Sequence, residues 1–421
     1  MSNTFSGNFS VRQRASLIAS ASVFALMLGL GNQTAKAADL YWDGAATTDT
    51  DADGGGGVWN DTETNWDDAE TGGNSVAWTS GSNAVFGGQN GGTITIDDDD
   101  DVIANDITVN TTSSSTDYTL TGDGEISAAD GDMVLTIQED QNLTLDTEIN
   151  DDANGPANLT VSNGGTLDIS GNGSLDFDNI NLQGGTSVEN SGTITADNGI
   201  AVSALDGETT SLTNNNALNG DITVTSTGTG DASVTNTSSA TIDGNVSVGA
   251  ADTTGSATLH NSGSVTGTVT VEANGDFTMD DGSVTTLINN AEGTFSLSDG
   301  TVGNLDTAGT TTLTGGTVAT LNVANGTTTV NGGEVSDASS VTGGTLDLDS
   351  GNLNAVTNNG GTIDMDGGEI ASLDNQSGEA TISGGDITGG VNNADTMTVE
   401  GGTLAGGLTN SGTLDLAVDQ T

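Results

Sequence analysis

The residues best suited to chemistry in this sequence are carboxylates, and one group of them has the spacing of a cation-binding loop. Asp49, Asp51 and Asp53 alternate along the chain, and Gly54 follows them directly. Carboxylates at loop positions 1, 3 and 5 with glycine at position 6 form the first half of an EF-hand calcium loop. Position 12, where that loop has a bidentate glutamate, is Asn60. The sequence therefore predicts a Ca²⁺ site at Asp49, Asp51 and Asp53, with a solvated acidic insertion as the alternative.

Catalytic side chains other than carboxylates are scarce. His260 is the single histidine, and it fills the position of Thr213 and Thr235 in related segments, so we expect a surface residue of a repeat and not a triad base. The sequence has no cysteine, no nucleophile elbow and no phosphate loop. We therefore predict that the protein is not an enzyme, with no catalytic residue and no required cofactor. A glycosidase needs only two carboxylates, so a secreted polysaccharide-acting β-helix enzyme using Asp pairs is the alternative.

The N-terminal segment has the pattern of an export signal. Arg12 and Arg14 form a basic region, and the apolar run after them is shorter than the roughly 20 residues that span a membrane. Ala35 and Ala37 supply the small side chains that signal peptidase requires. We therefore predict a cleaved signal peptide over residues 1–37 and a protein exported to the cell surface (outer membrane) or the extracellular space.

The charge of the chain excludes several partners. The sequence contains 59 Asp and Glu but only 3 Lys and Arg, and these three, Arg12, Arg14 and Lys36, all lie in the predicted signal peptide. The mature chain then carries 59 acids and no Lys or Arg, so it repels nucleic acid and anionic lipid. We expect no nucleic-acid partner and no membrane contact by the mature chain itself. Salt and divalent cations are expected to stabilise it by screening.

Repeats in the last third of the chain determine the predicted fold. An apolar residue stands two positions after each of a series of glycines spaced by 16 to 18 residues, and a second apolar residue follows three or four positions later, for example Leu287, Ala338 or Val391. The glycines are Gly282, Gly300, Gly316, Gly333, Gly351, Gly368, Gly385 and Gly402. A unit of this size cannot bury its own apolar side, but stacked copies form a continuous core. We therefore predict an all-β protein, a β-solenoid (β-helix), with 17-residue coils over residues 281–421.

Asparagines and a longer period extend this interpretation upstream. Asn289, Asn358, Asn375 and Asn392 follow the repeat glycines at one distance, and they are expected either to stack as a hydrogen-bonded ladder or only to tolerate a turn. Leu-Thr-Asn and similar triplets recur every 22 and 25 residues, each followed by a short alternating strand. The sequence therefore predicts larger coils of about 22–25 residues over 102–280.

The segment 38–101 has a different composition. All four tryptophans lie here, at Trp42, Trp59, Trp66 and Trp78. Because a solenoid needs an atypical terminal unit to cover its first coil, we predict a Trp-rich N-terminal cap. Carbohydrate binding by exposed tryptophans is the alternative.

The opening of the mature chain also resembles a known family. Tyr41-Trp-Asp-Gly44, Asn65-Trp66 and Ala84-Val-Phe86, placed between an Ala-x-Ala cleavage site and Gly/Thr/Asn-rich repeats, resemble the start of an autotransporter passenger with autotransporter-associated β-strand repeats. The resemblance implies an exported β-helix with a structural or adhesive role toward an unknown surface or matrix ligand. It also implies an outer-membrane β-barrel translocator. Since the sequence stops at Thr421 without such a barrel, we expect a fragment, a barrel encoded nearby, or free secretion.

Overall fold

The protein is all-β. The computed structural model describes residues 37–44, 51–97, 101–111, 117–129, 131–151, 157–252 and 254–417. These residues form 38 strands and no helix, and none of them belongs to a helix able to cross a membrane. The predicted signal peptide, with Arg12 and Arg14, lies outside the described residues, as does Asp49.

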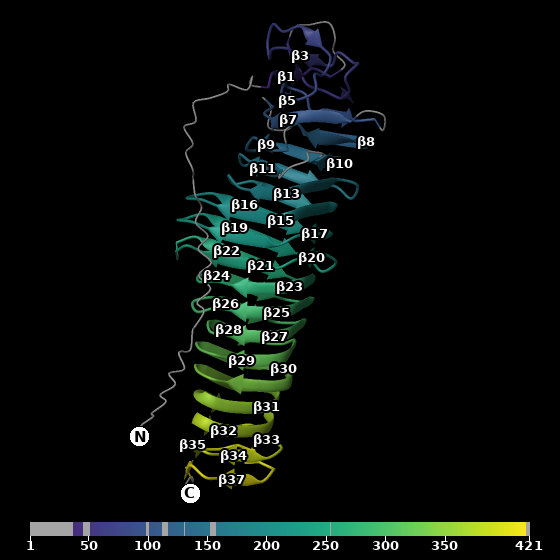
Figure 1. The fold of residues 1–421 in the computed structure, drawn as a ribbon. Helices are drawn as coiled ribbons and strands as arrows, with labels where there is room; N and C mark the ends of the chain where they lie inside the picture. The colour runs from purple at the N-terminus through teal and green to yellow at the C-terminus, as the bar shows by residue number, and fades with distance from the viewer. Residues whose placement is uncertain are drawn as a thin grey trace, which may run out of the picture. The chain divides into compact units, whose positions relative to one another are not determined.

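The chain winds into a β-solenoid of about 16 turns. Successive turns stack on one another in parallel (Figure 1), and each turn adds one strand to each of three parallel sheets, which we call faces 1, 2 and 3. The predicted fold class is therefore confirmed. Neighbouring strands of a sheet lie about 4.8 Å apart, so every coil satisfies the backbone hydrogen bonds of the coil before it.

The strands divide among the faces as follows. Face 1 contains β2 (Gly57–Val58), β6 (Gly92–Thr95), β12 (Thr166–Ile169), β14 (Ser187–Asn190), β16 (Thr209–Asn214), β19 (Asp231–Asn236), β22 (Ser256–Asn261), β24 (Gly275–Met279), β26 (Thr294–Leu297), β28 (Thr310–Leu313), β35 (Thr396–Val399) and β38 (Thr413–Leu416). Face 2 contains β17 (Ala217–Asn219), β20 (Thr241–Asp243), β33 (Asp386–Ile387) and β36 (Thr403–Leu404). Face 3 contains β1 (Asp39–Trp42), β5 (Ser82–Phe86), β9 (Met133–Ile137), β11 (Asn158–Ser162), β18 (Ile222–Ser226), β21 (Val246–Ala250), β34 (Val391–Asn393) and β37 (Leu408–Asn410).

The longer strands bend from one face to the next. They are β7 (Val102–Val109), β8 (Tyr118–Ala128), β10 (Asn142–Asn150), β13 (Ser174–Leu182), β15 (Thr193–Ala204), β23 (Ser264–Val271), β25 (Ser283–Asn289), β27 (Thr301–Thr307), β29 (Thr317–Val323), β30 (Thr327–Val341), β31 (Thr345–Met365) and β32 (Glu369–Ile382). Two short strands, β3 (Trp66–Asp67) and β4 (Ser75–Val76), pair antiparallel in the N-terminal segment.

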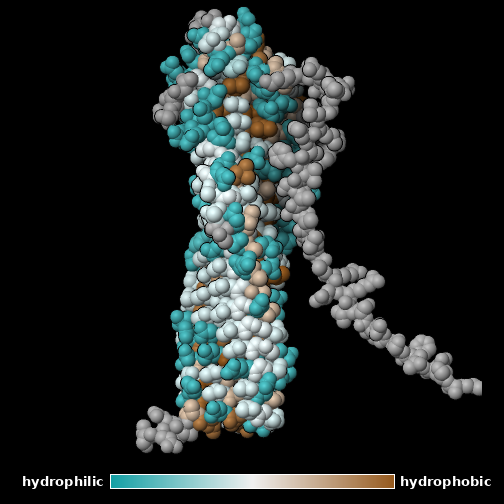
Figure 2. Space-filling model, turned by 90° about the vertical axis from the view of Figure 1, so that its left-hand side faces the viewer, coloured by the Kyte–Doolittle hydropathy of each residue, from teal (hydrophilic) through white to brown (hydrophobic). Residues whose placement is uncertain are grey.

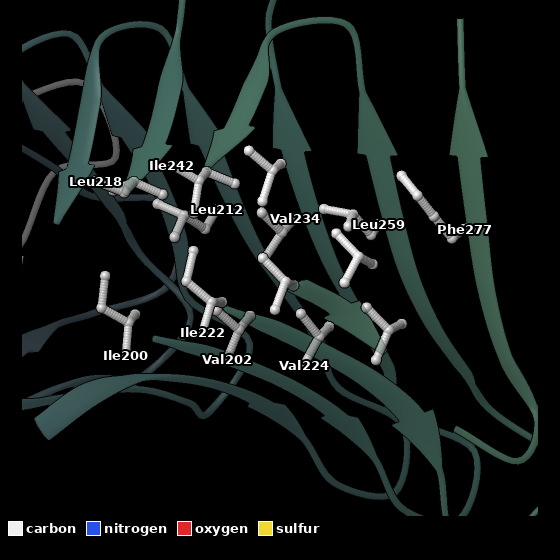
Figure 3. Close-up of a cluster of buried hydrophobic side chains, with 14 of the residues drawn as sticks. Ile200, Val202, Leu212, Leu218, Ile222, Val224, Val234, Ile242, Leu259 and Phe277 are labelled. Atoms are coloured by element: carbon white, nitrogen blue, oxygen red, sulfur yellow. The ribbon is translucent and has the colours of Figure 1, made fainter. Parts of the chain in front are cut away.

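Alternation along the strands builds the core. Inward side chains from the three faces, such as Leu212, Ile222 and Ile242, point toward one another in the interior (Figure 3), and each is at most 1% exposed. The residues between them face solvent, which is the period-2 pattern of a strand. A single coil buries only a few such side chains, so stability depends on stacking against its neighbours.

The predicted repeat positions stack in register, with one exception. Val284 pairs with Val302, and Val391 pairs with Leu373, as the spacing indicated. At the fourth unit, however, the buried position belongs to Ser339 and not to Ala338, which is exposed. The register shifts between Val335 and Ala338 because this coil has one extra residue there. Such a bulge exchanges the inward and outward positions of the residues that follow it.

The repeat glycines are required by backbone geometry. All eight have a positive φ, between 68 and 100 degrees, a region that residues other than glycine rarely adopt. At Gly368, a β-carbon would also lie 2.6 Å from the carbonyl oxygen of Gly351 in the preceding coil. The 17-residue period therefore marks a tight corner of each coil, at which the glycine has a positive φ and the backbones of neighbouring coils approach closely.

The asparagines form hydrogen-bonded ladders inside the solenoid. The side-chain amide of Asn358 donates to Asn375 at 2.9 Å, Asn375 donates to Asn393 at 2.7 Å, and Asn393 donates to Asn410 at 2.7 Å. The ladder interpretation is confirmed for Asn358 and Asn375. Asn289 is buried but donates to the Thr310 carbonyl and the Thr311 hydroxyl instead of to another asparagine. The next member after Asn375 is Asn393 and not Asn392, which is exposed, because that coil carries one additional residue before Val391. A second ladder of the same kind joins Asn190, Asn214, Asn236 and Asn261.

Substitution of a ladder asparagine should therefore be costly. Asn375→Ala removes the acceptor of Asn358 and the donor of Asn393, both of which are buried. We expect the free energy of unfolding to fall by about 1–3 kcal/mol, the usual cost of leaving buried polar groups unpaired. Urea unfolding followed by circular dichroism measures the change. Asn392→Ala is the matched control, since it removes only an exposed bond to Asp374, and an equal loss in both variants would contradict the ladder's role.

The tryptophans close the N-terminal end of the solenoid. Trp42, Trp59 and Trp66 are fully buried, and Trp78 is 5% exposed. Their rings pack edge to face, with centroids of Trp42 and Trp66 at 5.0 Å and of Trp59 and Trp78 at 4.9 Å. The rings fill the space next to the first complete coils, as a terminal cap does. Because the rings are buried, the alternative of carbohydrate binding on exposed tryptophans is wrong.

Candidate functional site

Two of the predicted calcium residues, Asp51 and Asp53, lie in the cap on the segment that precedes β2. Asp51 forms a bridge with Thr71 and accepts a hydrogen bond from the Gly72 amide at 3.2 Å. The backbone of Asp53 is held by the amides of Gln89 and Asn90. Asp49 lies outside the described residues. Among the residues that are described, no group of three His, Cys, Asp or Glu side chains is placed to hold a metal ion.

Asn60, the twelfth residue of the EF-like spacing, is used for local structure. Its side-chain oxygen accepts hydrogen bonds from the amides of Thr62 and Glu63, at 3.1 and 2.8 Å, and from the Thr62 hydroxyl. This is an Asx-type turn, in which a short polar side chain organises the residues directly after it. The oxygen is therefore occupied by backbone donors, and the similarity to an EF-hand is confined to Asp49, Asp51, Asp53 and Gly54.

His260 lies on the outer surface of face 1, in β22. It pairs in register with Thr235, which in turn pairs with Thr213, so the predicted repeat position is confirmed. Its Nε2 lies 3.1 Å from a carboxylate oxygen of Asp280, and both side chains are nearly half exposed. A contact between two side chains exposed to this degree contributes little to stability.

A cleft of about 430 Å³ lies among the described residues. It lies where face 1 turns into face 2 across three consecutive coils, beside β8, β10 and the start of β13. Four carboxylates line it, together with Thr121, Gly122, Gly124, Thr147, Asn172 and Ser174. The carboxylates are those of Asp123, Glu125, Asp146 and Glu148.

Asp146 is the best-anchored carboxylate of this cleft. It accepts hydrogen bonds from the hydroxyls of Ser170 and Thr121 and from the amide of Asn172, so donors from both neighbouring coils converge on it. These bonds, chiefly that from Ser170, lower the pKa of Asp146, because they favour the charged form. A carboxylate held in this way stays ionised and suits a base, a nucleophile or a cation ligand, but not a general acid.

Sequence reasoning did not single out this cleft. Its residues come from three coils, and the segment upstream of residue 160 shows no clean repeat from which the coils could be aligned. The available signal was the Gly122-Asp-Gly-Glu run, which interrupts the alternation of β8. Glycine within a strand often marks a bend or a close approach of the backbone.

The fold and the cleft define the chain as a parallel β-solenoid with an aromatic cap and an acidic corner. Comparison with family models, with curated proteins and with solved structures finds no match to this chain.

Proposed function

We propose that this chain is an exported bacterial cell-surface passenger whose role is structural or adhesive and involves no catalysis. The observation that supports this most is the unbroken solenoid itself. About 16 similar coils present the same outward positions many times along three faces, and repeated weak contacts to a surface or matrix ligand add up through multivalency. The partner on the cell side is an outer-membrane β-barrel translocator.

The charge pattern also supports export in an extended form. All three basic residues precede Ala38, and the chain has no cysteine, so neither salt bridges to Lys or Arg nor disulfides lock a folded state before transport. Each coil is completed by the coil beside it, and a solenoid can therefore fold progressively from one end. The passenger would reach the cell surface or the medium, with Ca²⁺ at Asp49, Asp51 and Asp53 as an optional ligand of the cap.

Export and processing are tested together by expression of the full chain in a Gram-negative host. We expect exported protein to begin at Ala38 and to give no internal tryptic fragment, since no Lys or Arg follows Lys36. Amino-terminal sequencing and mass spectrometry after trypsin measure both properties. Ala37→Lys is the control, because it blocks cleavage and retains a trypsin-sensitive leader. Exported material that keeps Met1, or protein found only in the cytoplasm, would contradict the proposal.

The acidic cleft favours a second candidate, a polysaccharide-acting β-helix enzyme. Glycosidases act through two carboxylates, and Asp146 is fixed and ionised as a base or nucleophile must be. Under this alternative, Asp146→Asn would abolish release of reducing sugar from a panel of polysaccharides, while Asp306→Asn on exposed face 3 would leave it unchanged. Absence of release by the unaltered protein across the panel would reject the alternative and favour the non-catalytic role.

A further inference from the structure

The outer surface of face 1 carries two columns of hydroxyl side chains. Seven successive strands, from β16 to the start of β30, align in register, and in each of them two outward residues flank one shared inward position. The first three of these strands, β16, β19 and β22, have a third outward residue at their start. Twelve of these fourteen outward residues are Ser or Thr. They are Ser211, Thr213, Ser233, Thr235, Thr258, Thr278, Thr294, Ser296, Thr310, Thr312, Thr327 and Thr329, and the exceptions are His260 and Asp276. We call this surface the hydroxyl face.

The hydroxyl face is regular along the solenoid. Its strands pair without a register shift over these seven coils. Faces 2 and 3, in contrast, shift between Val265 and Thr268 and again between Val318 and Leu321. Figure 2 views the protein from the side on which β16 to β28 lie in Figure 1, and rows of atoms of intermediate hydropathy run along its middle. The hydroxyls therefore form a repeating two-dimensional array.

The hydroxyl face is also nearly free of charge, although the chain has 59 acids. Asp276 is the single carboxylate among the fourteen positions, and Asp231 is exposed beside them at the start of β19. Acids return at the same positions in the flanking coils, at Glu189 and Asp347. His260 is the one ring on this surface. A polysaccharide-binding platform uses aromatic rings, and an anionic or cationic partner needs charge, so the composition points to a neutral ligand that bonds to hydroxyls.

Most of these hydroxyls are available to such a ligand. Ser211 bonds to Ser187 at 3.1 Å and Thr329 lies 3.5 Å from Asp347. Within the described part of the chain, however, the hydroxyls of Thr310 and Thr327, in the last two strands of the array, have no side-chain partner. Both are exposed. Threonine is stiff about χ1, and its sheet backbone is fixed, so little entropy is lost when the array binds.

We propose that the hydroxyl face binds ice. Strands of a sheet lie about 4.8 Å apart, and alternate residues along a parallel strand lie about 6.6 Å apart. Both distances are close to repeats of the oxygen lattice on a face of hexagonal ice. A rigid array of hydroxyl and methyl groups at this spacing can hold water molecules at positions that match those of the ice lattice. The ordered water then joins the protein surface to the ice crystal. This inference does not rest on the proposed surface role or on export.

The test is thermal hysteresis and adsorption of the purified protein to ice. We expect the unaltered protein to lower the freezing point below the melting point, to shape ice crystals and to partition into a growing ice surface. Thr310→Tyr with Thr327→Tyr should lose most of the hysteresis, because two bulky rings in adjacent coils break the flat array. Circular dichroism and the Tm of both proteins show whether the fold is retained.

Thr301→Tyr with Thr320→Tyr is the matched control. Thr301 and Thr320 are exposed and lie on faces 2 and 3 of neighbouring coils, so the control should keep full hysteresis. The proposal is overturned if the unaltered protein shows no hysteresis, or if the control loses as much as the test variant. It is also overturned if the protein binds crystalline cellulose or chitin through the hydroxyl face and leaves ice untouched.

Discussion

Replacement of Trp66 by alanine is expected to lower the free energy of unfolding by about 3–5 kcal/mol, the usual cost of truncating a buried tryptophan. Trp66 is fully buried, and its ring centroid lies 5.0 Å from that of Trp42, 5.2 Å from that of Trp59 and 5.6 Å from that of Phe86. Removal of the indole leaves a cavity at the centre of the cap. Because a solenoid frays from an uncovered end, we expect the first coils to open before the remainder.

Guanidinium unfolding monitored by tryptophan fluorescence and by circular dichroism measures this effect. The two signals should separate in Trp66→Ala, since the remaining tryptophans report on the cap and circular dichroism reports on all coils. Leu205→Ala is the control, because Leu205 is 58% exposed and its truncation removes little buried surface. A midpoint for Trp66→Ala equal to that of the control would show that the aromatic cluster does not stabilise the solenoid.

The fold could be predicted because its signal is repeated many times. Inward residues such as Val302 and Leu305 are read from alternation and from the glycine period, and the positive φ at Gly300 explains why that period is conspicuous. Single-residue insertions could not be placed in this way. Ser339 has the hydropathy of a surface residue, and only its coil partners Leu321 and Val356 show that it faces inward.

Sites were less predictable than the fold because they arise between coils. Asp146 has its donors on residues 24 to 26 positions away, and no local motif joins them. The hydroxyl face is similarly hard to recognise in any one segment, since two Ser or Thr residues around an inward residue are an ordinary strand pattern until the register aligns seven strands. The calcium prediction used a local motif instead. The side-chain oxygen of Asn60, the last position of that motif, accepts a hydrogen bond from the Glu63 amide within a turn.

Acidification from about pH 7 toward about pH 4 is expected to raise the Tm. Burial raises the pKa of Asp151, Asp168, Asp176, Asp276 and Asp347, and nearby carboxylates add to the effect at all but Asp276. A carboxyl whose pKa is raised on folding holds its proton more tightly in the folded state. Its stabilising contribution is therefore complete below the unfolded value of 3.8 and is lost as the pH rises through the folded value.

Carboxylates with lowered pKa act in the opposite direction, but in a lower pH range. Hydrogen bonds lower the pKa of Asp68, Asp146 and Asp252, so their contribution is present above 3.8 and is lost only as the pH falls below it. Between about pH 7 and about pH 4 the raised groups therefore determine the sign. With 59 acids and no Lys or Arg beyond Lys36, protonation of the carboxylates also relieves general self-repulsion.

Thermal melts at several pH values, each in low salt and in sodium chloride, test this electrostatic origin. We expect the gain in Tm on acidification to shrink in high salt, because screening already removes part of the repulsion at neutral pH.

A melt in calcium, after removal of trace metal by a chelator, separates screening from binding. A rise in Tm that is larger than the rise in magnesium, and that is lost in Asp51→Ala with Asp53→Ala, would place calcium in the cap. A Tm that falls steadily from pH 7 to pH 4 would show that carboxylate repulsion does not limit the stability of the solenoid.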